Sequence, residues 1–127
     1  MMGAMNTIIE VALNGSTTPG RNPTVPIDDD GLIEQGLACL QAGASILHCH
    51  TPNHAQSPEE AADSYGTVFT AWLAADPEVL VMPTLGAGTT IADKLGHVDL
   101  LARRGQARIG FIDPGSMILG WADDGGN

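Results

Sequence analysis

The amino-acid sequence predicts an α/β fold in which successive βα units build a parallel sheet. Short apolar runs alternate along the chain with segments of helical spacing, and a glycine-bearing loop follows most of the runs. The spacing between runs leaves room for one helical crossover, as parallel neighbours require. The length of 127 residues is that of one domain and suffices to bury a core of ordinary size. We therefore expect four strands and three helices in a single domain.

Four apolar runs predict the strands. Each run is short, rich in β-branched residues or leucine, and punctuated by proline or glycine, which is typical of strands buried on both faces. The runs are TIIEVAL (7–13), ASILHCH (44–50), EVLVMPT (78–84) and ARIGFI (107–112).

The first helix is predicted directly after VPIDDDG. Asp28 is a suitable N-cap, and Asp29 and Asp30 are favoured near the positive end of the helix dipole. The apolar side chains that follow fall on one stripe and are Leu32, Ile33, Leu37 and Leu40. The sequence QAG then ends the helix.

Two further helices are predicted from their termini. The second begins at SPEE, where Ser57 is the cap and Pro58 the first helical residue, and it extends to about Ala75, before Asp-Pro. The third covers about residues 90–104 and ends at RRG, with cations in its last turn and Gly105 as the stop signal.

Composition and charge exclude several classes of partner. The chain has 15 acidic and 5 basic residues, a formal net charge of -10, which argues against binding to nucleic acid or to an anionic membrane. No apolar stretch approaches the roughly 20 residues of a membrane span, and the N-terminal sequence lacks the basic region of a secretory signal. Cys39 and Cys49 form no disulfide or metal motif, so we expect reduced core thiols in a cytoplasmic protein.

The loops that follow the strands are the places to search for a site, because ligands gather at the carboxyl ends of parallel strands. These loops contain most of the residues that could bind a metal or a substrate. Their sequences are NGSTTPGRNP, HCHTPNHAQ, PTLGAGTT and DPGSMILG.

A histidine pair ends the second predicted strand. Because successive strand side chains point to opposite faces, His48 and His50 should project to one side with Ile46, while Leu47 and Cys49 face the other. Two imidazoles in this relation can bind one zinc or similar divalent ion, about 2.0–2.1 Å from each nitrogen. The alternative is that they are partly exposed polar residues at the end of a strand.

A catalytic zinc usually has three protein ligands, so a third is needed. His54 lies in the loop after the pair and is either this ligand or a solvated loop residue. Asp113, at the end of the fourth predicted strand, is either a ligand or a turn-forming residue before Pro114. His97 lies inside the third predicted helix, away from the strand ends, and is expected to be structural or on the surface.

Two glycine-containing loops have open interpretations. GAGTTI (86–91) resembles part of a dinucleotide fingerprint, but Ile91 stands at the third glycine position and the chain has no Walker lysine pattern. Thr89 and Thr90 either present a helix N-terminus to a carboxylate or phosphate, or form a capped tight turn. Ser116 either presents itself and nearby amides to a ligand or turns the chain, and it lacks the surroundings of a nucleophile.

In this order and spacing, four motifs resemble the β-keto acid cleavage enzymes, the family that includes 3-keto-5-aminohexanoate cleavage enzyme. The motifs are IIEVALNGSTT with NPTVPI, AGASILHCH, PTLGAG and IDPGSM. The resemblance covers essentially the whole chain but only the N-terminal half of the family's TIM (β/α)8 barrel. It implies that residues 1–127 are a single half-barrel domain of about four strands, truncated relative to the family.

The resemblance also implies an activity. Members of the family use zinc and acetyl-CoA to cleave a β-keto acid, and the products are acetoacetate and a new CoA ester. His48 and His50 match the zinc histidines, while the catalytic acid-base residues belong to the second half of the barrel. The positions that match substrate-contacting residues are Asn14, Gly15, Thr17, Thr84, Gly86, Asp113 and Ser116.

Three departures from the family pattern matter. Thr17 stands where some members have an acidic residue that reads a substrate amino group, which implies a different side chain on the keto acid. Pro52 replaces an expected arginine beside the metal. The third departure is the truncation to half a barrel. Because half a barrel leaves open edges and an uncovered inner face, we expect a homo-oligomer or a complementing C-terminal half.

The alternative function is a non-catalytic half-barrel that binds a metal or small ligand.

Overall fold

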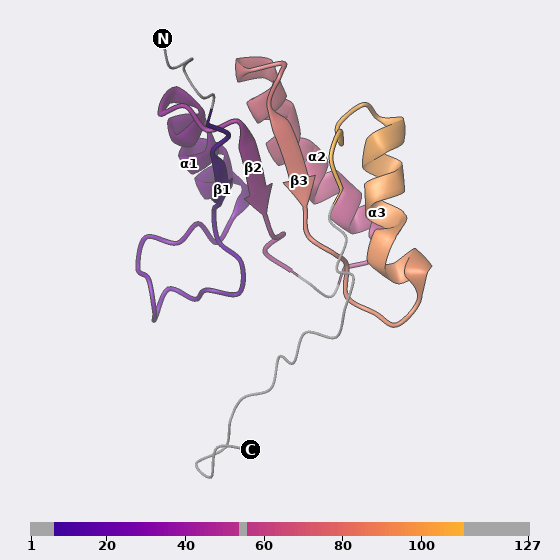
Figure 1. The fold of residues 1–127 in the computed structure, drawn as a ribbon. Helices are drawn as coiled ribbons and strands as arrows, with labels where there is room; N and C mark the ends of the chain where they lie inside the picture. Colours follow the sequence, from indigo (N-terminus) through magenta and orange to yellow (C-terminus); the bar gives the residue numbers. More distant parts are fainter. Residues whose placement is uncertain (1–6, 54–55, 111–127) are drawn as a thin grey trace.

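Three parallel strands and three helices alternate along residues 7–53 and 56–110, which are the residues that this computed structural model describes. The elements in chain order are β1 (Glu10–Ala12), α1 (Asp29–Gln41), β2 (Ile46–Cys49), α2 (Pro58–Ala75), β3 (Leu80–Pro83) and α3 (Ile91–Arg103). The sheet order is β1-β2-β3, and both strand pairs are parallel. The predicted alternation of parallel βα units is therefore confirmed over these residues (Figure 1).

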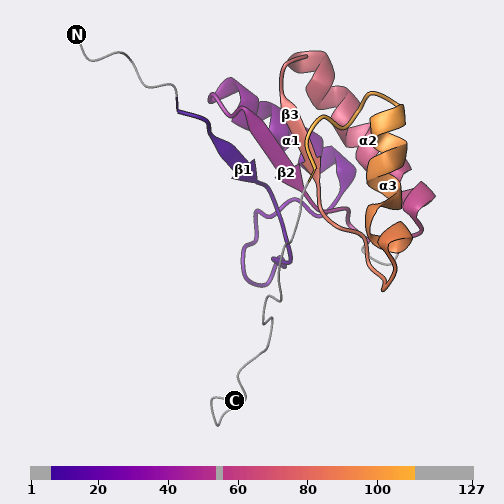
Figure 2. The same cartoon turned by 45° about the vertical axis from the view of Figure 1, so that its right-hand side comes forward.

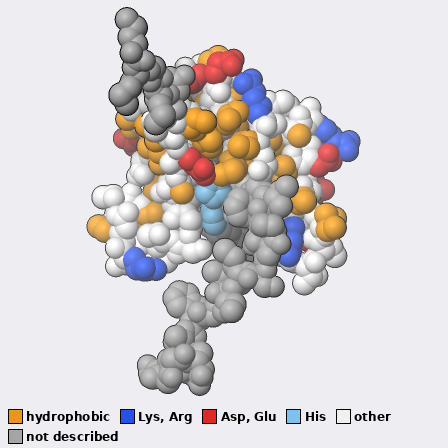
Figure 3. Space-filling model, in the orientation of Figure 1, with side chains coloured by type: hydrophobic (Ala, Val, Ile, Leu, Met, Phe, Trp, Pro, Cys, Tyr) orange, Lys and Arg blue, Asp and Glu red, His pale blue; other side chains and the backbone are white. Residues whose placement is uncertain are grey.

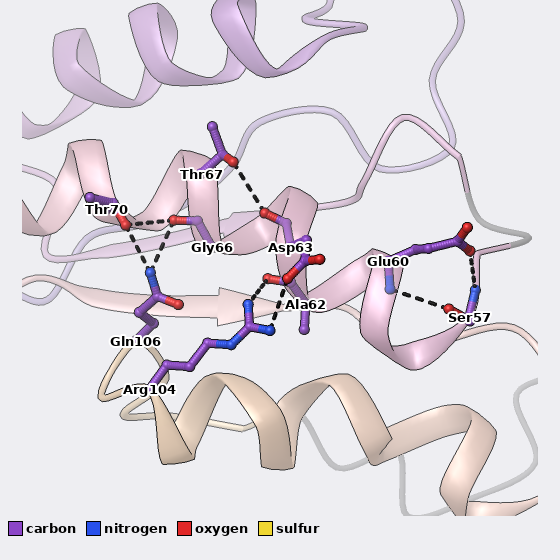
Figure 4. Close-up of polar contacts among 9 residues, drawn as sticks. All are labelled: Ser57, Glu60, Ala62, Asp63, Gly66, Thr67, Thr70, Arg104 and Gln106. Carbon is purple, nitrogen blue, oxygen red and sulfur yellow. Dashed lines mark hydrogen bonds and ion pairs between the residues drawn. The ribbon is translucent and has the colours of Figure 1, made fainter.

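The helices begin at the predicted caps. The Asp28 carboxylate accepts a hydrogen bond from the Gly31 amide at 2.8 Å. Ser57 and Glu60 form a capping box, in which the serine hydroxyl accepts from the Glu60 amide and the glutamate accepts from the Ser57 amide (Figure 4). Thr90 and Asp93 form a second box at α3. These local bonds satisfy amides that have no partner inside the helix, which explains why the boundaries could be read from the sequence.

The three helices form one layer on one face of the sheet (Figures 1 and 2). One residue from each strand packs toward this layer. These residues are Val11, Leu47 and Val81, which are neighbours in register across the sheet. The buried core is completed from the helices by Leu32, Ala62, Tyr65, Val68, Phe69, Trp72 and Leu101. The core thus lies between the sheet and its helices, as βα units require.

The other face of the sheet carries two rows of side chains. Glu10, Ile46 and Leu80 form one row, and Ala12, His48 and Met82 form the next. No described helix covers this face, and Figure 3 shows apolar side chains on it with histidine at one end of them. The face is partly apolar and ends in the histidine pair.

The fourth predicted strand is not formed over residues 107–110, and residues 111–112 lie outside the described part of the chain. The segment is nevertheless attached to the turn before β3, because the Arg108 guanidinium donates to the Pro77 carbonyl. Gly110 weakens a strand here, because glycine has no side chain to pack. The expectation of four strands is therefore wrong for the described residues, which form three.

The chain that leaves α3 is fastened to α2 (Figure 4). Arg104 donates to the Ala62 carbonyl at 3.2 Å and forms an ion pair with Asp63 at 2.8 Å. Gln106 donates to the Gly66 carbonyl at 3.1 Å and to the Thr70 hydroxyl at 2.8 Å. These contacts hold the two helices in register along their outer surface.

None of the helices in the described part of the chain is long and apolar enough to cross a membrane.

Candidate functional site

His48 and His50 lie at the carboxyl end of β2, on the face opposite the helices. Their neighbours Leu47 and Cys49 are 0% exposed and belong to the core, whereas both histidines are half-buried. The two ring centroids are 5.2 Å apart and the rings are nearly perpendicular, at 83°. The prediction that strand parity brings the two imidazoles to one side is confirmed.

The His48 ring is oriented by the neighbouring strand. Its Nδ1 lies 3.0 Å from the Met82 carbonyl oxygen, which can only accept a hydrogen bond. Nδ1 therefore donates this hydrogen bond, which leaves Nε2 as the ring atom through which His48 would bind a metal. Metal-binding histidines commonly have this arrangement, in which a backbone carbonyl selects the tautomer and fixes the ring.

The separation of the rings fits a shared tetrahedral ion. With about 2.0–2.1 Å from metal to nitrogen and about 1.1 Å more to the ring centre, two imidazoles at the tetrahedral angle have centroids roughly 5.2 Å apart. The observed centroid distance is 5.2 Å. Within the described residues no group of three His, Cys, Asp or Glu side chains forms a metal-binding cluster. The residues present fit two of the ligands that a zinc site needs.

Asn14 holds the backbone at His50. Its side-chain amide donates to the His50 carbonyl at 3.0 Å, and its oxygen accepts from the His50 amide at 2.9 Å. The same oxygen accepts from the Gly15 amide at 2.8 Å. The asparagine side chain thus imitates a peptide group and extends the β1-β2 ladder by one rung. The sequence suggested only a substrate contact for Asn14.

A cavity of about 290 Å³ lies beside the histidine strand. Its lining residues are Asn14, Gly15, Ser16, Thr17, Thr18, Pro26, Ile27, Thr51 and Pro52. The structure therefore brings together three of the predicted substrate positions, Asn14, Gly15 and Thr17, next to the residues that follow His50. Pro52 lines the cavity where an arginine was expected, and it supplies neither charge nor donor.

The loop after β3 is held by side chains from two helices. The Tyr65 hydroxyl accepts from the Thr84 amide at 3.2 Å and donates to the Cys49 carbonyl at 3.3 Å, so it joins the ends of β2 and β3. His97 Nε2 donates to the Thr84 carbonyl at 2.8 Å. The amide and the carbonyl of Thr84 are therefore both hydrogen-bonded, which fixes the start of the loop. Sequence reasoning predicted neither contact with Thr84, because Tyr65 and His97 both lie far from it in the chain.

The expectation that His97 lies away from the strand ends is wrong. It occupies the second turn of α3, is 1% exposed, and stacks on Tyr65 with centroids 5.6 Å apart. Because α3 begins just after the β3 loop and turns back along the sheet, its first two turns lie beside the end of β3. The structural role that the sequence predicted for this histidine is confirmed.

The GAGTTI loop forms a capped turn. A Cβ on Gly86 would lie 2.4 Å from the Asp93 carbonyl oxygen, so only glycine fits here. Hydrogen bonds from Thr90 lower the pKa of Asp93, which holds a negative charge at the start of α3. This carboxylate satisfies the helix N-terminus and opposes a second anion, so the capped-turn interpretation is favoured over a phosphate site.

Burial shifts the pKa of three further groups, Cys49, Tyr65 and His97. It raises the pKa of the Cys49 thiol and of the Tyr65 hydroxyl, so both stay protonated at neutral pH. Cys39 and Cys49 are free cysteines, as expected. Burial lowers the pKa of His97 below its ordinary value of 6.5, against the opposing effect of its hydrogen bond to Thr84.

The shifted pKa of His97 predicts a loss of stability in mild acid. Below about pH 6.5 the unfolded chain takes up a proton at this residue, while the folded chain does so only at lower pH. The contribution of neutral His97 to the free energy of unfolding is therefore complete above pH 6.5, and it is lost as pH falls from 6.5 through the pKa of the folded state. Urea unfolding of wild type and His97→Gln between pH 7.5 and 5 checks this. The variant should have the shallower pH dependence, and identical slopes would contradict the assignment.

Other predicted site residues lie elsewhere or outside the structure. Thr84 and Gly86 line a second, smaller cavity together with Thr51, which borders both cavities. His54, Asp113 and Ser116 lie outside the described residues.

Comparisons with known proteins agree with the motifs. The profile of the beta-keto acid cleavage enzyme family matches residues 6–125. The 3-keto-5-aminohexanoate cleavage enzyme of Acetoanaerobium sticklandii is 25% identical over 88 residues, which are 68% of this chain and 32% of that enzyme. The 3-oxoadipate:acetyl-CoA acetyltransferase of Cupriavidus necator is 36% identical over 63 residues, 49% of this chain and 22% of that enzyme.

The matched segments thus span less than a third of the length of either relative. The family profile, in contrast, matches nearly all of the chain, and the matched region contains the histidine pair and the loops around it. This chain belongs to the β-keto acid cleavage enzyme family.

Proposed function

We propose that this chain supplies two metal ligands, His48 and His50, and part of the substrate site of a zinc-dependent β-keto acid cleavage enzyme. The observation that carries the proposal is the histidine pair, whose ring centroids lie 5.2 Å apart and whose His48 ring is oriented by the Met82 carbonyl at 3.0 Å. Family membership supports the reaction class. The reaction is the cleavage of a β-keto acid with acetyl-CoA, which yields acetoacetate and a new CoA ester.

The bound ion would act as a Lewis acid that polarises the β-keto carbonyl and stabilises the negative charge that develops during carbon-carbon cleavage. The chain's own residues would orient the site. Asn14 fixes the His50 backbone through two hydrogen bonds, and Met82 fixes the His48 tautomer. Both contacts preorganise the ligand pair, so that little reordering accompanies metal binding.

The cavity beside the histidines suggests the nature of the keto acid. Its described lining contains no charged side chain, and Thr17 stands where a substrate amino group would need a carboxylate. A neutral distal group on the substrate fits this lining, because a buried ammonium without a partner would lose its hydration uncompensated. We further assign substrate contacts to Asn14, Gly15, Thr84, Gly86, Asp113 and Ser116.

The site needs further βα units to be complete. We propose that residues 1–127 form a half-barrel domain whose open face and free strand edges are covered either by a second copy or by a complementing C-terminal half. Exposed edges and a partly apolar face favour such pairing. The remaining ligand and the acid-base residues would come from those units. The free cysteines support a cytoplasmic location.

The alternative is a non-catalytic half-barrel that binds a metal or a small ligand. The observation in its favour is that the described residues offer two metal-binding side chains and no cluster of three. An assay for acetoacetate, with β-keto acids and acetyl-CoA, separates the two functions. Metal binding without product, in every assembly tested, favours the binding module.

Metal analysis tests the first step of the proposal. We expect the purified chain to bind zinc, and we expect His48→Ala to abolish stoichiometric binding because one imidazole remains. Asn14→Ala should weaken binding by about 10–100-fold, since it releases the backbone of a ligand. His97→Gln is the matched control, because it removes an imidazole elsewhere and should leave zinc binding unchanged. Absence of zinc from the wild-type chain, or equal binding by His48→Ala, would contradict the proposal.

A further inference from the structure

A second, much smaller cavity lies between the segment after β2 and the start of α3. Its volume is about 10 Å³, and its lining residues are Thr51, Asn53, Gln56, Ala61, Tyr65, Thr84, Leu85, Gly86 and His97. A space of about 10–15 Å³ is the least that accommodates one water molecule. The lining comes from both strand-end loops and from α2 and α3, so any molecule held here contacts several elements.

Two residues of this lining each have one side-chain polar atom that is buried without a hydrogen bond in the described structure. These atoms are Gln56 Oε1 and His97 Nδ1. The His97 side chain as a whole is 1% exposed, so bulk water does not reach its ring. A buried polar atom without a partner destabilises the fold, and native proteins satisfy most such atoms with protein groups or ordered water.

The chemistry of the two atoms defines what can satisfy them. His97 Nε2 lies 2.8 Å from the Thr84 carbonyl oxygen, which only accepts, so Nε2 carries the ring proton. Nδ1 of the neutral ring is then an acceptor. The amide oxygen of Gln56 is also an acceptor. A ligand that serves both must be small and must donate two hydrogen bonds.

We propose that one water molecule binds in this cavity and donates to both His97 Nδ1 and Gln56 Oε1. Water has two donors and the required size. An ammonium or a metal ion does not suit the site, because no charged side chain lines it and the ion would lose its hydration without compensation. The burial that lowers the pKa of His97 supports the neutral ring.

The bound water connects two loops of the candidate site. Gln56 belongs to the segment that follows the histidine strand, and His97 holds the Thr84 carbonyl at the end of β3. Through the water, the position of one loop is coupled to that of the other. The inference concerns an internal hydrogen-bond site and does not depend on the proposed enzymatic activity.

A crystal structure and histidine NMR of the full chain test the proposal. We expect one water about 2.7–3.2 Å from both atoms, and the Nε2–H tautomer of His97 at neutral pH. The proposal is overturned by a Gln56 amide nitrogen that donates directly to Nδ1, by a cavity without water, or by the Nδ1–H tautomer.

A variant pair provides a second measurement. Gln56→Leu removes one acceptor of the water, so the Nδ1 nitrogen resonance of His97 should move toward that of an unbonded acceptor. Gln41→Leu is the control, because Gln41 is exposed at the end of α1 and should leave this resonance unchanged. An unchanged resonance in Gln56→Leu would count against the shared water. If Gln56→Leu does not fold, the wild-type structure and tautomer decide.

Discussion

Gly36→Ala is expected to lower the free energy of unfolding by about 3 kcal/mol. A Cβ at this position would lie 2.1 Å from Nε1, 2.3 Å from Cε2 and 2.6 Å from Cζ2 of Trp72. The indole is 0% exposed and is held from α2, so it has little room to retreat. On an exposed helix the same change would stabilise the chain by about 1 kcal/mol, because alanine is the better helix former. The clash therefore reverses the usual sign.

Urea unfolding followed by circular dichroism checks this result. Gly20→Ala is the control, since the nearest atom to its added Cβ is 3.9 Å away and the residue lies in an exposed loop. In a Trp72→Phe background, Gly36→Ala should cost less than it does in the wild-type chain, because the smaller ring leaves space for the methyl group. A Gly36→Ala variant as stable as wild type would refute the close approach of α1 to α2.

Leu47→Ala is expected to cost about 2–5 kcal/mol, the range for a leucine truncated in a packed core. Leu47 is 0% exposed in the middle strand and packs against the helix layer. Leu80 lies one strand away but faces the other side of the sheet and is only half-buried. Leu80→Ala should therefore cost about 1 kcal/mol or less in the monomer, because less apolar area is lost.

The same pair of variants reports on pairing of the open face. If two copies cover that face, the cost of Leu80→Ala should grow with protein concentration, whereas the cost of Leu47→Ala should not. Unfolding at low and high concentration, with light scattering for the oligomeric state, separates these outcomes. A Leu47→Ala cost below 1 kcal/mol would contradict the packing of β2 on the helices.

The helix boundaries were predictable because their signals are local. Asp28, Ser57 and Thr90 each accept a hydrogen bond from an amide three residues ahead, so the residues that decide the boundary are neighbours in sequence. The strands were located by their apolar runs, although the ladder covers fewer residues than each run. The fourth run illustrates the difference, since its described residues, 107–110, match the pattern of a strand but form no ladder.

The candidate site was predictable in part for the same reason. Strand parity alone brings His48 and His50 to one side, because the period of a strand is two residues. Hydrogen bonds between residues far apart in the sequence could not be predicted in this way. Tyr65 and His97 meet the Thr84 backbone from two different helices, and Asn14 meets His50 across 36 residues of sequence.

By itself, the sequence of this chain determined the order of strands and helices, the caps, and the common side of the two histidines. Each of these depends on residues within about four positions of one another, where periodicity and hydrogen bonding act locally. Only the tertiary structure decided that Asn14 holds His50, that Met82 selects the His48 tautomer, and that His97 reaches the end of β3. These contacts join residues far apart in the chain. They exist because packing of the helices on the sheet brings otherwise unsatisfied backbone groups within hydrogen-bond distance of these side chains.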